Sequence, residues 1–310
     1  MISLCLNLAK EIGFRPTETA LNIVFDWLGI KAKVPSFDSI RVWSCRVGIA
    51  QLKLLVRDDE AWIWLADHSN QIGQEKVLQI IGIRVKDLPP IGETLPRDKM
   101  MVLATVPGTS WTRDDVRREY RKLAERLGPP AYLVTDGAVE LIESADALKM
   151  EGKTPIVLQA SLGFINRHGV YHGAAAKLKI ELAALQSTHP PDCDLIACEL
   201  STTMVAKLLA FVEESESKLP EGDRAWLSTE NLESLFGQYK RLEGQHSKGG
   251  FTSLIAALPM LLTHWTPDKV RASLTAVPVK AVQAWVQENL TTTLTSKRST
   301  AYKEFATNSG

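Results

Sequence analysis

Two aspartates in this sequence stand where short apolar runs end. Asp67 ends the run 61–67, and Asp136 lies near the end of the run 131–137. If both runs are strands of one sheet, the two carboxylates can stand side by side at one edge of it. Gathered carboxylates repel one another unless cations neutralise them, and such hard oxygen ligands suit Mg²⁺ or Mn²⁺. Two ions roughly 4 Å apart would support phosphodiester chemistry. The alternative is that both are ordinary strand-end or capping residues.

Other catalytic signatures are absent from the sequence. It has no Gly-rich phosphate loop, no H-E-x-x-H motif and no G-x-S-x-G motif, which argues against an ATPase, a dehydrogenase and a serine hydrolase. His168 and His172 have the spacing of helical metal ligands, but Gly169 and Gly173 favour a loop instead. No C-x-x-C pair occurs, and four reduced thiols are expected at Cys5, Cys45, Cys193 and Cys198.

The surrounding pattern predicts a mixed α/β protein with the order β-β-β-α-β-α-β. Strands are expected at 61–67, 77–85, 99–106, 131–137 and 154–158. Thr112 is the predicted N-cap of a long helix that Gly128 ends, and a further helix is expected at 138–149. From about residue 160 the chain is predicted to be helical, with segments near 173–187, 195–217, 228–241, 251–263, 267–275 and 278–290.

The first 57 residues read as two helices with a short link, beginning near Pro16 and after the N-cap candidate Ser36. This is the outline of a helix-turn-helix, and we expect a DNA-binding segment with contacts from Arg41 and Arg46. The tryptophans of the predicted helices and strands are expected to pack in the core: Trp27, Trp43, Trp62, Trp64 and Trp285.

Composition and charge restrict the function further. The 310 residues are 45% apolar, and 36 basic residues balance 36 acidic ones. The neutrality is a cancellation: residues 1–57 carry +4, 58–250 carry −7, and 251–310 carry +3. This excludes a uniformly basic nucleic-acid binder but is compatible with a DNA-binding arm beside an acidic site. No apolar run reaches the roughly 18 residues that a membrane helix needs, so no membrane partner is expected. The sequence shows no signal peptide, so we expect a cytoplasmic protein.

The helix over 113–126 has arginines at every fourth position. Arg113, Arg117 and Arg121 could follow a DNA backbone, but interleaved acidic residues favour a solvated face with ion pairs.

Three longer stretches resemble the acidic blocks of bacterial insertion-sequence transposases of the DDE class. They are WLADHSNQIGQEKVLQIIGIRV (64–85), YLVTDGAVEL (132–141) and ENLESLFGQYKRLEGQHSKGGFTSL (230–254), and VPSFDSIRVWSCRVGIAQL (34–52) resembles the segment before the first block. The resemblance implies a ribonuclease H-like catalytic domain at 58–250 with a reduced helical insertion. The segment 1–57 would then be the DNA-binding part, and 251–310 a helical C-terminal segment with a frayed tail.

The resemblance also implies site residues. Asp67, Asp136 and Glu233 match the three catalytic acids, which would hold Mg²⁺ or Mn²⁺, and Lys240 matches the basic residue that follows the third acid. Seven residues are two helical turns, so Glu233 and Lys240 share a helix face. Gln245, His246 and Lys248, in the predicted loop that follows, are further candidates for DNA contacts. Trp226 and Thr229 stand where related proteins have Tyr and Arg.

The implied reaction is cleavage at transposon ends followed by attack of the freed 3′-hydroxyl on target DNA. The implied partner is double-stranded DNA, bound by a homodimer near the nucleoid. The short segment between Asp136 and Glu233 and the abrupt N-terminus suggest an internal deletion and truncation. Three functions therefore stay open: an active transposase, a non-catalytic DNA-binding remnant, and a structure-specific nuclease of the same fold.

Overall fold

The computed structural model describes ten stretches of the chain. They are residues 13–68, 75–90, 97–136, 138–150, 156–159, 168–187, 195–225, 230–244, 252–262 and 265–290. The helices are α2 (Phe14–Trp27), α3 (Phe37–Leu54), α4 (Arg113–Leu127), α5 (Val139–Glu143), α7 (Ala174–Ser187), α8 (Leu195–Ser217), α9 (Glu230–Gly244), α10 (Pro267–Ala276) and α11 (Val279–Asn289). Four 3-10 segments are η1 (Val85–Asp87), η2 (Arg97–Lys99), η3 (Ser144–Leu148) and η4 (Thr252–Leu261).

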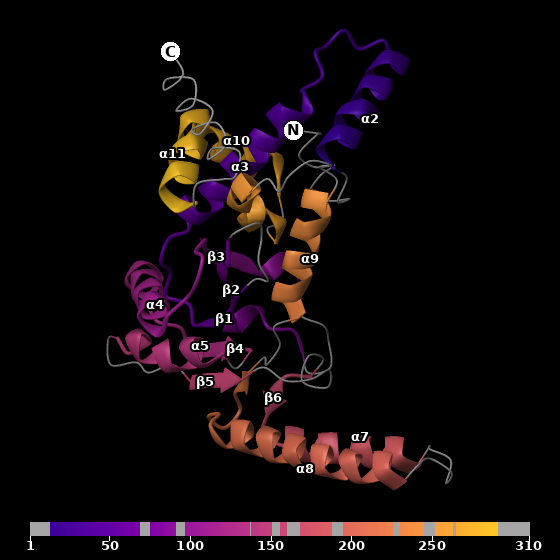
Figure 1. Cartoon of the computed structure of the whole chain (residues 1–310), viewed down its shortest axis with the longest axis vertical. Coiled ribbons are helices and arrows are strands. Elements are labelled where there is room, and N and C mark those ends of the chain that lie inside the picture. The colour runs from indigo at the N-terminus through magenta and orange to yellow at the C-terminus, as the bar shows by residue number, and fades with distance from the viewer. Residues whose placement is uncertain are drawn as a thin grey trace, which may run out of the picture.

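A five-stranded mixed sheet forms the centre of the molecule (Figure 1). Its strands are β1 (Trp62–His68), β2 (Leu78–Arg84), β3 (Met101–Val106), β4 (Tyr132–Thr135) and β5 (Ile156–Gln159), in the spatial order β3-β2-β1-β4-β5. β1 pairs antiparallel with β2, and β2 with β3, whereas β4 runs parallel to both β1 and β5. The predicted mixed α/β class and the predicted order β-β-β-α-β-α-β, which runs from β1 to β5, are confirmed. A further two-stranded sheet, β6 (Val170–Tyr171) with β7 (Arg224–Ala225), was not predicted, because strands this short show no periodicity.

Side-chain alternation along β1 divides the core into two layers. Ile63 and Leu65 belong to one hydrophobic cluster, which also contains residues of α3, α9, η4, α10 and α11. Trp62, Trp64 and Ala66 point to the opposite face and pack with residues of α4, α5 and η3. Successive side chains of a strand point to opposite faces, so neighbouring residues at the end of β1 serve different layers. This division decides which helices reach the candidate site.

Local capping explains where two of the long helices begin. The side chain of Ser36 accepts a hydrogen bond from Ser39 N at the start of α3, as predicted. Thr112 and Asp115 form a reciprocal capping box at the start of α4, and Gly128 follows its end with φ of 83°. A positive φ is readily available only to glycine, so the predicted stop is confirmed with its physical reason.

The predicted division of the chain at residues 57 and 250 does not separate independent units. α3 buries one face, including Ile40, Val47 and Ile49, in the same cluster as Ile63 of the sheet. It packs most extensively against η4, and also contacts α10 and α11. Through this face α3 is part of the same hydrophobic core as the sheet.

The tryptophans follow the packing prediction with one exception. Trp62 and Trp64 are buried, and Trp43 and Trp285 are partly buried against the first cluster. Trp27 at the end of α2 is 84% exposed, so its predicted packing is wrong. Only the first half of α2 is anchored, through Phe14, Thr17 and Leu21. The apolar stripe of α2 therefore extends further along the sequence than the part of the helix that is buried.

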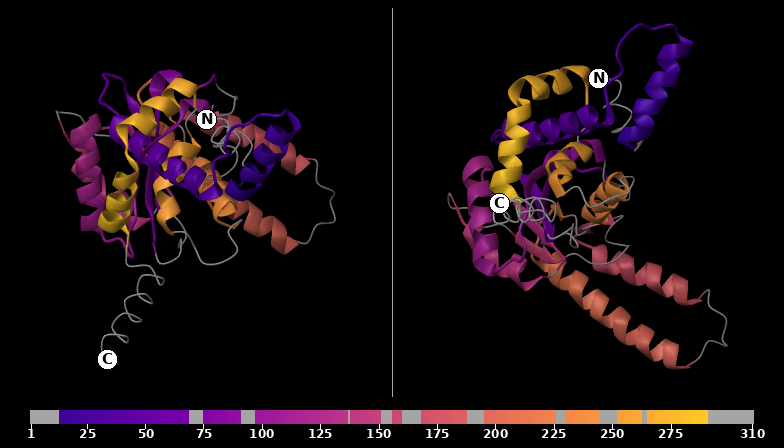
Figure 2. Two further views of the ribbon diagram at one scale, coloured as in Figure 1. Left: turned by 90° about the horizontal axis from the view of Figure 1, so that it is seen from above. Right: turned by 45° about the horizontal axis from the view of Figure 1, so that its top comes forward.

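Helices α7 and α8 lie side by side and project from the sheet as an arm (Figures 1 and 2). The β6–β7 pair lies at its base, where β6 contacts α8. Among the described residues, no helix is sufficiently long and apolar to cross a membrane.

A glycine permits the close contact between α3 and η4. A Cβ atom on Gly48 would lie 2.1 Å from Ala256 O and 2.9 Å from Ala257 Cα, both of which are backbone atoms. Gly48→Ala is therefore expected to destabilise the protein by about 2–3 kcal/mol or more, because backbone must move to relieve the overlap. Urea denaturation would measure this loss.

Gly237→Ala is the matched control, because a Cβ atom there meets nothing within 4 Å on the helix α9. It should stabilise by up to about 1 kcal/mol through helix propensity. Equal effects of the two substitutions would contradict the close-contact argument.

Candidate functional site

The two strand-end aspartates lie together at one edge of the sheet. β1 and β4 are parallel, and Ala66 is the register partner of Thr135, so the next residues along both strands are Asp67 and Asp136. The charge of Asp136 raises the pKa of Asp67, so the two carboxylates lie within electrostatic reach of each other. Asp136 also accepts a hydrogen bond of 3.0 Å from Ala138 N, which ties its carboxylate to the turn before α5. The paired carboxylates predicted from the strand ends are therefore present.

The third predicted acid comes from a helix far along the chain. α9 packs through Leu232, Leu235, Phe236 and Tyr239 into the first hydrophobic cluster, the one on the Ile63 side of β1. Glu233 is exposed on this helix, and its charge acts on Asp67. The charges of Asp136 and Glu233 both act on Asp67, so the structure brings the three acids into one electrostatic neighbourhood. Within the described residues, no three or more histidine, cysteine, aspartate or glutamate side chains are gathered closely enough to hold a metal ion.

The environment of Asp67 disfavours its charged form. Burial is the main cause and the charge of Asp136 the next, and together with Glu233 they raise the pKa of Asp67 to about 7. A hydrogen bond of 2.6 Å from His68 N to Asp67 Oδ1 acts in the opposite direction. Carboxylate oxygens that repel each other in this way are a donor set suited to a hard divalent cation. Asp67 and Asp136, with Glu233 beside them, fit such an ion in their chemistry.

The predicted DNA contacts fall into three groups. Lys240 is exposed on α9, two turns after Glu233, as the spacing predicts. His246 and Lys248 lie outside the described residues, as do Gln245, Trp226 and Thr229. The third group consists of the arginines of α3.

Both arginines of α3 contact the C-terminal segment of the protein. Arg46 donates from Nε to Val277 O at 2.6 Å and from Nη2 to Leu274 O. These carbonyls end helix α10, so Arg46 caps that helix. Arg41 lies 3.5 Å from Asp38 and donates to Ser253 Oγ at 3.5 Å. We therefore leave both out of the DNA contacts proposed below, since their guanidinium groups hold α3 against its neighbours.

The arginine-rich face of α4 has the solvated character that its interleaved acids predict. Arg113 pairs with Glu143 at 3.1 Å, and Arg117 pairs with Asp146. Arg118 pairs with Asp115 at 2.9 Å within the helix. The pairs of Arg113 and Arg117 hold α4 against α5 and η3 with modest energies, because they are exposed.

Sequence reasoning missed a polar cluster on the other face of the same sheet edge. His68 follows Asp67 and therefore points to the α4–α5 face, where its ring stacks on Trp111 with centroids 5.8 Å apart. Glu140 Oε1 lies 3.5 Å from His68 Nδ1 and 3.8 Å from Lys76 Nζ. Burial, followed by the charge of Lys76, lowers the pKa of His68 to about 4. The four members of this polar cluster, His68, Lys76, Trp111 and Glu140, come from separate segments of the chain. Only the adjacency of Asp67 and His68 in the sequence could have suggested the cluster.

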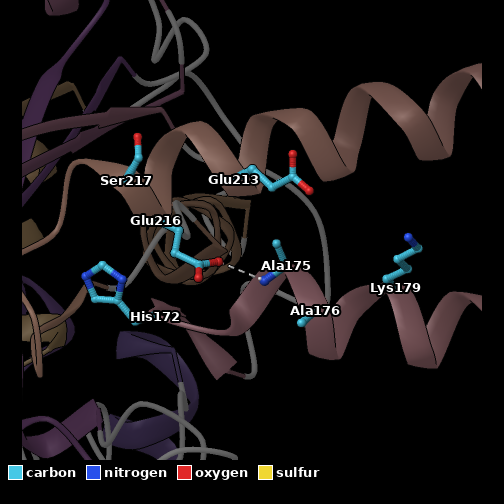
Figure 3. A pocket seen from close by; sticks show the side chains of 7 residues that line it. All are labelled: His172, Ala175, Ala176, Lys179, Glu213, Glu216 and Ser217. Carbon is cyan, nitrogen blue, oxygen red and sulfur yellow. Dashed lines mark hydrogen bonds between the residues drawn. The ribbon is translucent and has the colours of Figure 1, made fainter.

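An open pocket of about 470 Å³ lies at the base of the arm (Figure 3). Glu216 accepts hydrogen bonds there from Gly173 N and, at 3.0 Å, from Ala175 N, and so caps α7. His172 Nε2 contacts Leu219 O at 2.9 Å, whereas His168 Nε2 lies 3.9 Å from Glu181. The two histidines stand on either side of β6 with different partners, which agrees with the predicted loop and not with a helical metal site.

No protein-family model matches the sequence, and no curated protein matches it significantly.

Proposed function

We propose that this protein is a DDE transposase of a bacterial insertion sequence, with a ribonuclease H-like catalytic domain. The observation that carries the proposal is the placement of Asp67 and Asp136 side by side at the ends of adjacent parallel strands, with the charge of Glu233 on α9 acting on Asp67. The order β-β-β-α-β along the chain, with the aspartates at the ends of β1 and β4, supports the proposal, because this is the order on which the resemblance rests. The site works on double-stranded DNA, in the cytoplasm at the nucleoid, as a homodimer that handles two transposon ends.

In this proposal the three acids act as ligands of Mg²⁺ or Mn²⁺. When bound, the cation supplies charge stabilisation at the phosphate and activation of the attacking oxygen. Asp67 gives up its proton when it becomes a ligand, because the raised pKa leaves it partly protonated near neutral pH. Lys240 contacts a DNA phosphate two helical turns from Glu233, and so orients the strand along α9.

The chemistry requires two in-line displacements at phosphorus. In the first, water attacks the phosphodiester and the 3′ oxygen leaves, which gives a 3′-hydroxyl and a 5′-phosphate. In the second, that 3′-hydroxyl attacks a target phosphodiester, loses its proton and displaces another 3′ oxygen. The number of phosphodiester bonds is unchanged in the second step, so no external energy source or organic cofactor is needed.

A second candidate is a non-catalytic DNA-binding remnant of such a transposase. It is favoured by the absence, among the described residues, of a set of three side chains gathered to hold a metal ion. The substitutions at Trp226 and Thr229 favour it too. In a remnant, the acidic pair would persist without supporting cleavage.

One experiment distinguishes the two candidates. The purified protein is incubated with Mg²⁺ or Mn²⁺ and a supercoiled plasmid carrying the DNA that flanks its coding sequence. A transposase nicks the plasmid at the ends of the inserted segment and joins the free 3′ ends to new sites. A remnant binds the same DNA but leaves it intact. Absence of both binding and cleavage would exclude the two proposals together.

A further inference from the structure

Lys76 occupies a fixed position beside the carboxylate pair. Its backbone N donates to Gly108 O at 2.5 Å, and its carbonyl accepts a hydrogen bond of 2.7 Å from Trp111 Nε1. The residue stands two positions before β2, whose first residue, Leu78, is the register partner of His68. Lys76 therefore lies at the same edge of the sheet as Asp67, and its main chain is held there from two sides.

The ammonium group of Lys76 has a partner that it can exchange. Its Nζ lies 3.8 Å from Glu140 Oε1, which is an ion pair but longer than a hydrogen bond. The Lys76 side chain is 40% exposed, so water reaches it. Exposed ion pairs of this kind are weak, so a phosphate oxygen can replace Glu140 as the partner of Lys76. Lys86, at the other end of β2, is instead hydrogen-bonded to Glu60.

The neighbouring imidazole is not placed to bind a phosphate itself. The His68 side chain is only 6% exposed, and its ring stacks on Trp111. Within the described cluster of His68, Lys76, Trp111 and Glu140, the accessible cation is therefore that of Lys76. The ammonium group of Lys76 lies at the sheet edge that carries Asp67 and Asp136, whose negative charges repel an approaching DNA strand.

We propose that Lys76 is a positioning residue that binds a DNA phosphate next to the cleaved one, on the α4–α5 side of the carboxylate pair. This inference rests on the proposed function. Lys240 would hold the strand on the α9 side and Lys76 on the opposite side, so that the phosphate between them lies at Asp67 and Asp136. Glu140 keeps the ammonium oriented until DNA arrives.

The test is the salt dependence of DNA binding by Lys76→Gln. Binding of the flanking duplex is measured in Ca²⁺ over a range of salt concentrations, with Lys86→Gln as the matched control. One lost phosphate contact lowers the slope of log K against log salt by about 0.9 and weakens binding roughly 3–10-fold. Lys86→Gln should leave the slope unchanged, because Lys86 lies at the far end of β2.

Two further variants separate DNA contact from simple neutralisation of Glu140. Lys76→Arg keeps the charge and should restore the slope, which also shows that the loss is not a folding defect. If Lys76 only neutralises Glu140, the double variant Lys76→Gln/Glu140→Gln will bind like the parent, and the inference is overturned.

The remaining outcomes are equally distinct. A parent protein that binds DNA, with a slope unaffected by Lys76→Gln, would overturn the inference while leaving the proposed function intact. A parent protein that does not bind DNA at all would overturn both.

Discussion

Asp67→Asn is expected to lower cation-dependent DNA nicking by at least about 1,000-fold. The substitution keeps the size of the side chain but removes one negative ligand from the pair with Asp136. Several kcal/mol of transition-state stabilisation depend on the bound cation, and each 1.36 kcal/mol corresponds to a factor of ten in rate. Plasmid nicking in Mn²⁺ measures the effect, and Asp136→Asn should match it.

The control for this prediction is Asp59→Asn. Asp59 is exposed just before β1, at the opposite end of the strand from Asp67, so its substitution should leave nicking unchanged. DNA binding in Ca²⁺ should survive in the Asp67 variant, since binding depends on basic residues. Nicking that persists in both aspartate variants would show that the carboxylate pair is not the catalytic centre.

The cation-free protein should lose stability as the pH rises through about 7. The pKa of Asp67 is raised from 3.8 to about 7, so the folded state holds this proton more tightly than the unfolded state. The contribution is complete below pH 4 and is lost as the pH rises through 7. A shift of this size corresponds to a few kcal/mol at most. Urea denaturation at pH 5 and 8.5 should show the loss in the parent.

Asp67→Asn provides the internal comparison, because an amide has no proton to lose in this range. The variant should be less pH-dependent than the parent and more stable than it at pH 8.5. Mg²⁺ should bind more tightly as the pH rises, by up to tenfold per unit until about pH 7, because binding displaces the Asp67 proton. Parallel stability curves for the two proteins would refute the assigned origin of the shift.

The meeting of two carboxylates at the sheet edge could be predicted, because the carboxyl ends of adjacent parallel strands lie at the same edge of a sheet. Asp67 and Asp136 each follow an apolar run, so pairing the runs places the carboxylates together. The caps at Ser36 and Thr112 could be predicted as well, since a capping side chain bonds to a backbone N–H only three residues ahead.

Contacts between distant segments could not be predicted from local patterns. The burial of α3 depends on η4, more than 200 residues later, so its helical stripe was equally compatible with a DNA-binding helix. The capping of α10 by Arg46 and the polar cluster around Glu140 could not be predicted for the same reason, because each joins residues that lie far apart in the sequence. Only the resemblance pointed to Glu233. This residue lies on α9, which follows α7 and α8 in the sequence, and no spacing rule predicts that such a distant helix packs beside the aspartates of the sheet.

The contact of Gly48 with Ala256 has a consequence for synthesis of the protein on the ribosome. At roughly 5–20 residues per second, the about 200 residues between them take on the order of 10–40 s to be made. During this time the apolar face of α3 has left the ribosome, but η4, which covers this face in the folded protein, has not yet been synthesised. The nascent chain is therefore expected to depend on chaperones, and N-terminal fragments that end before η4 should aggregate.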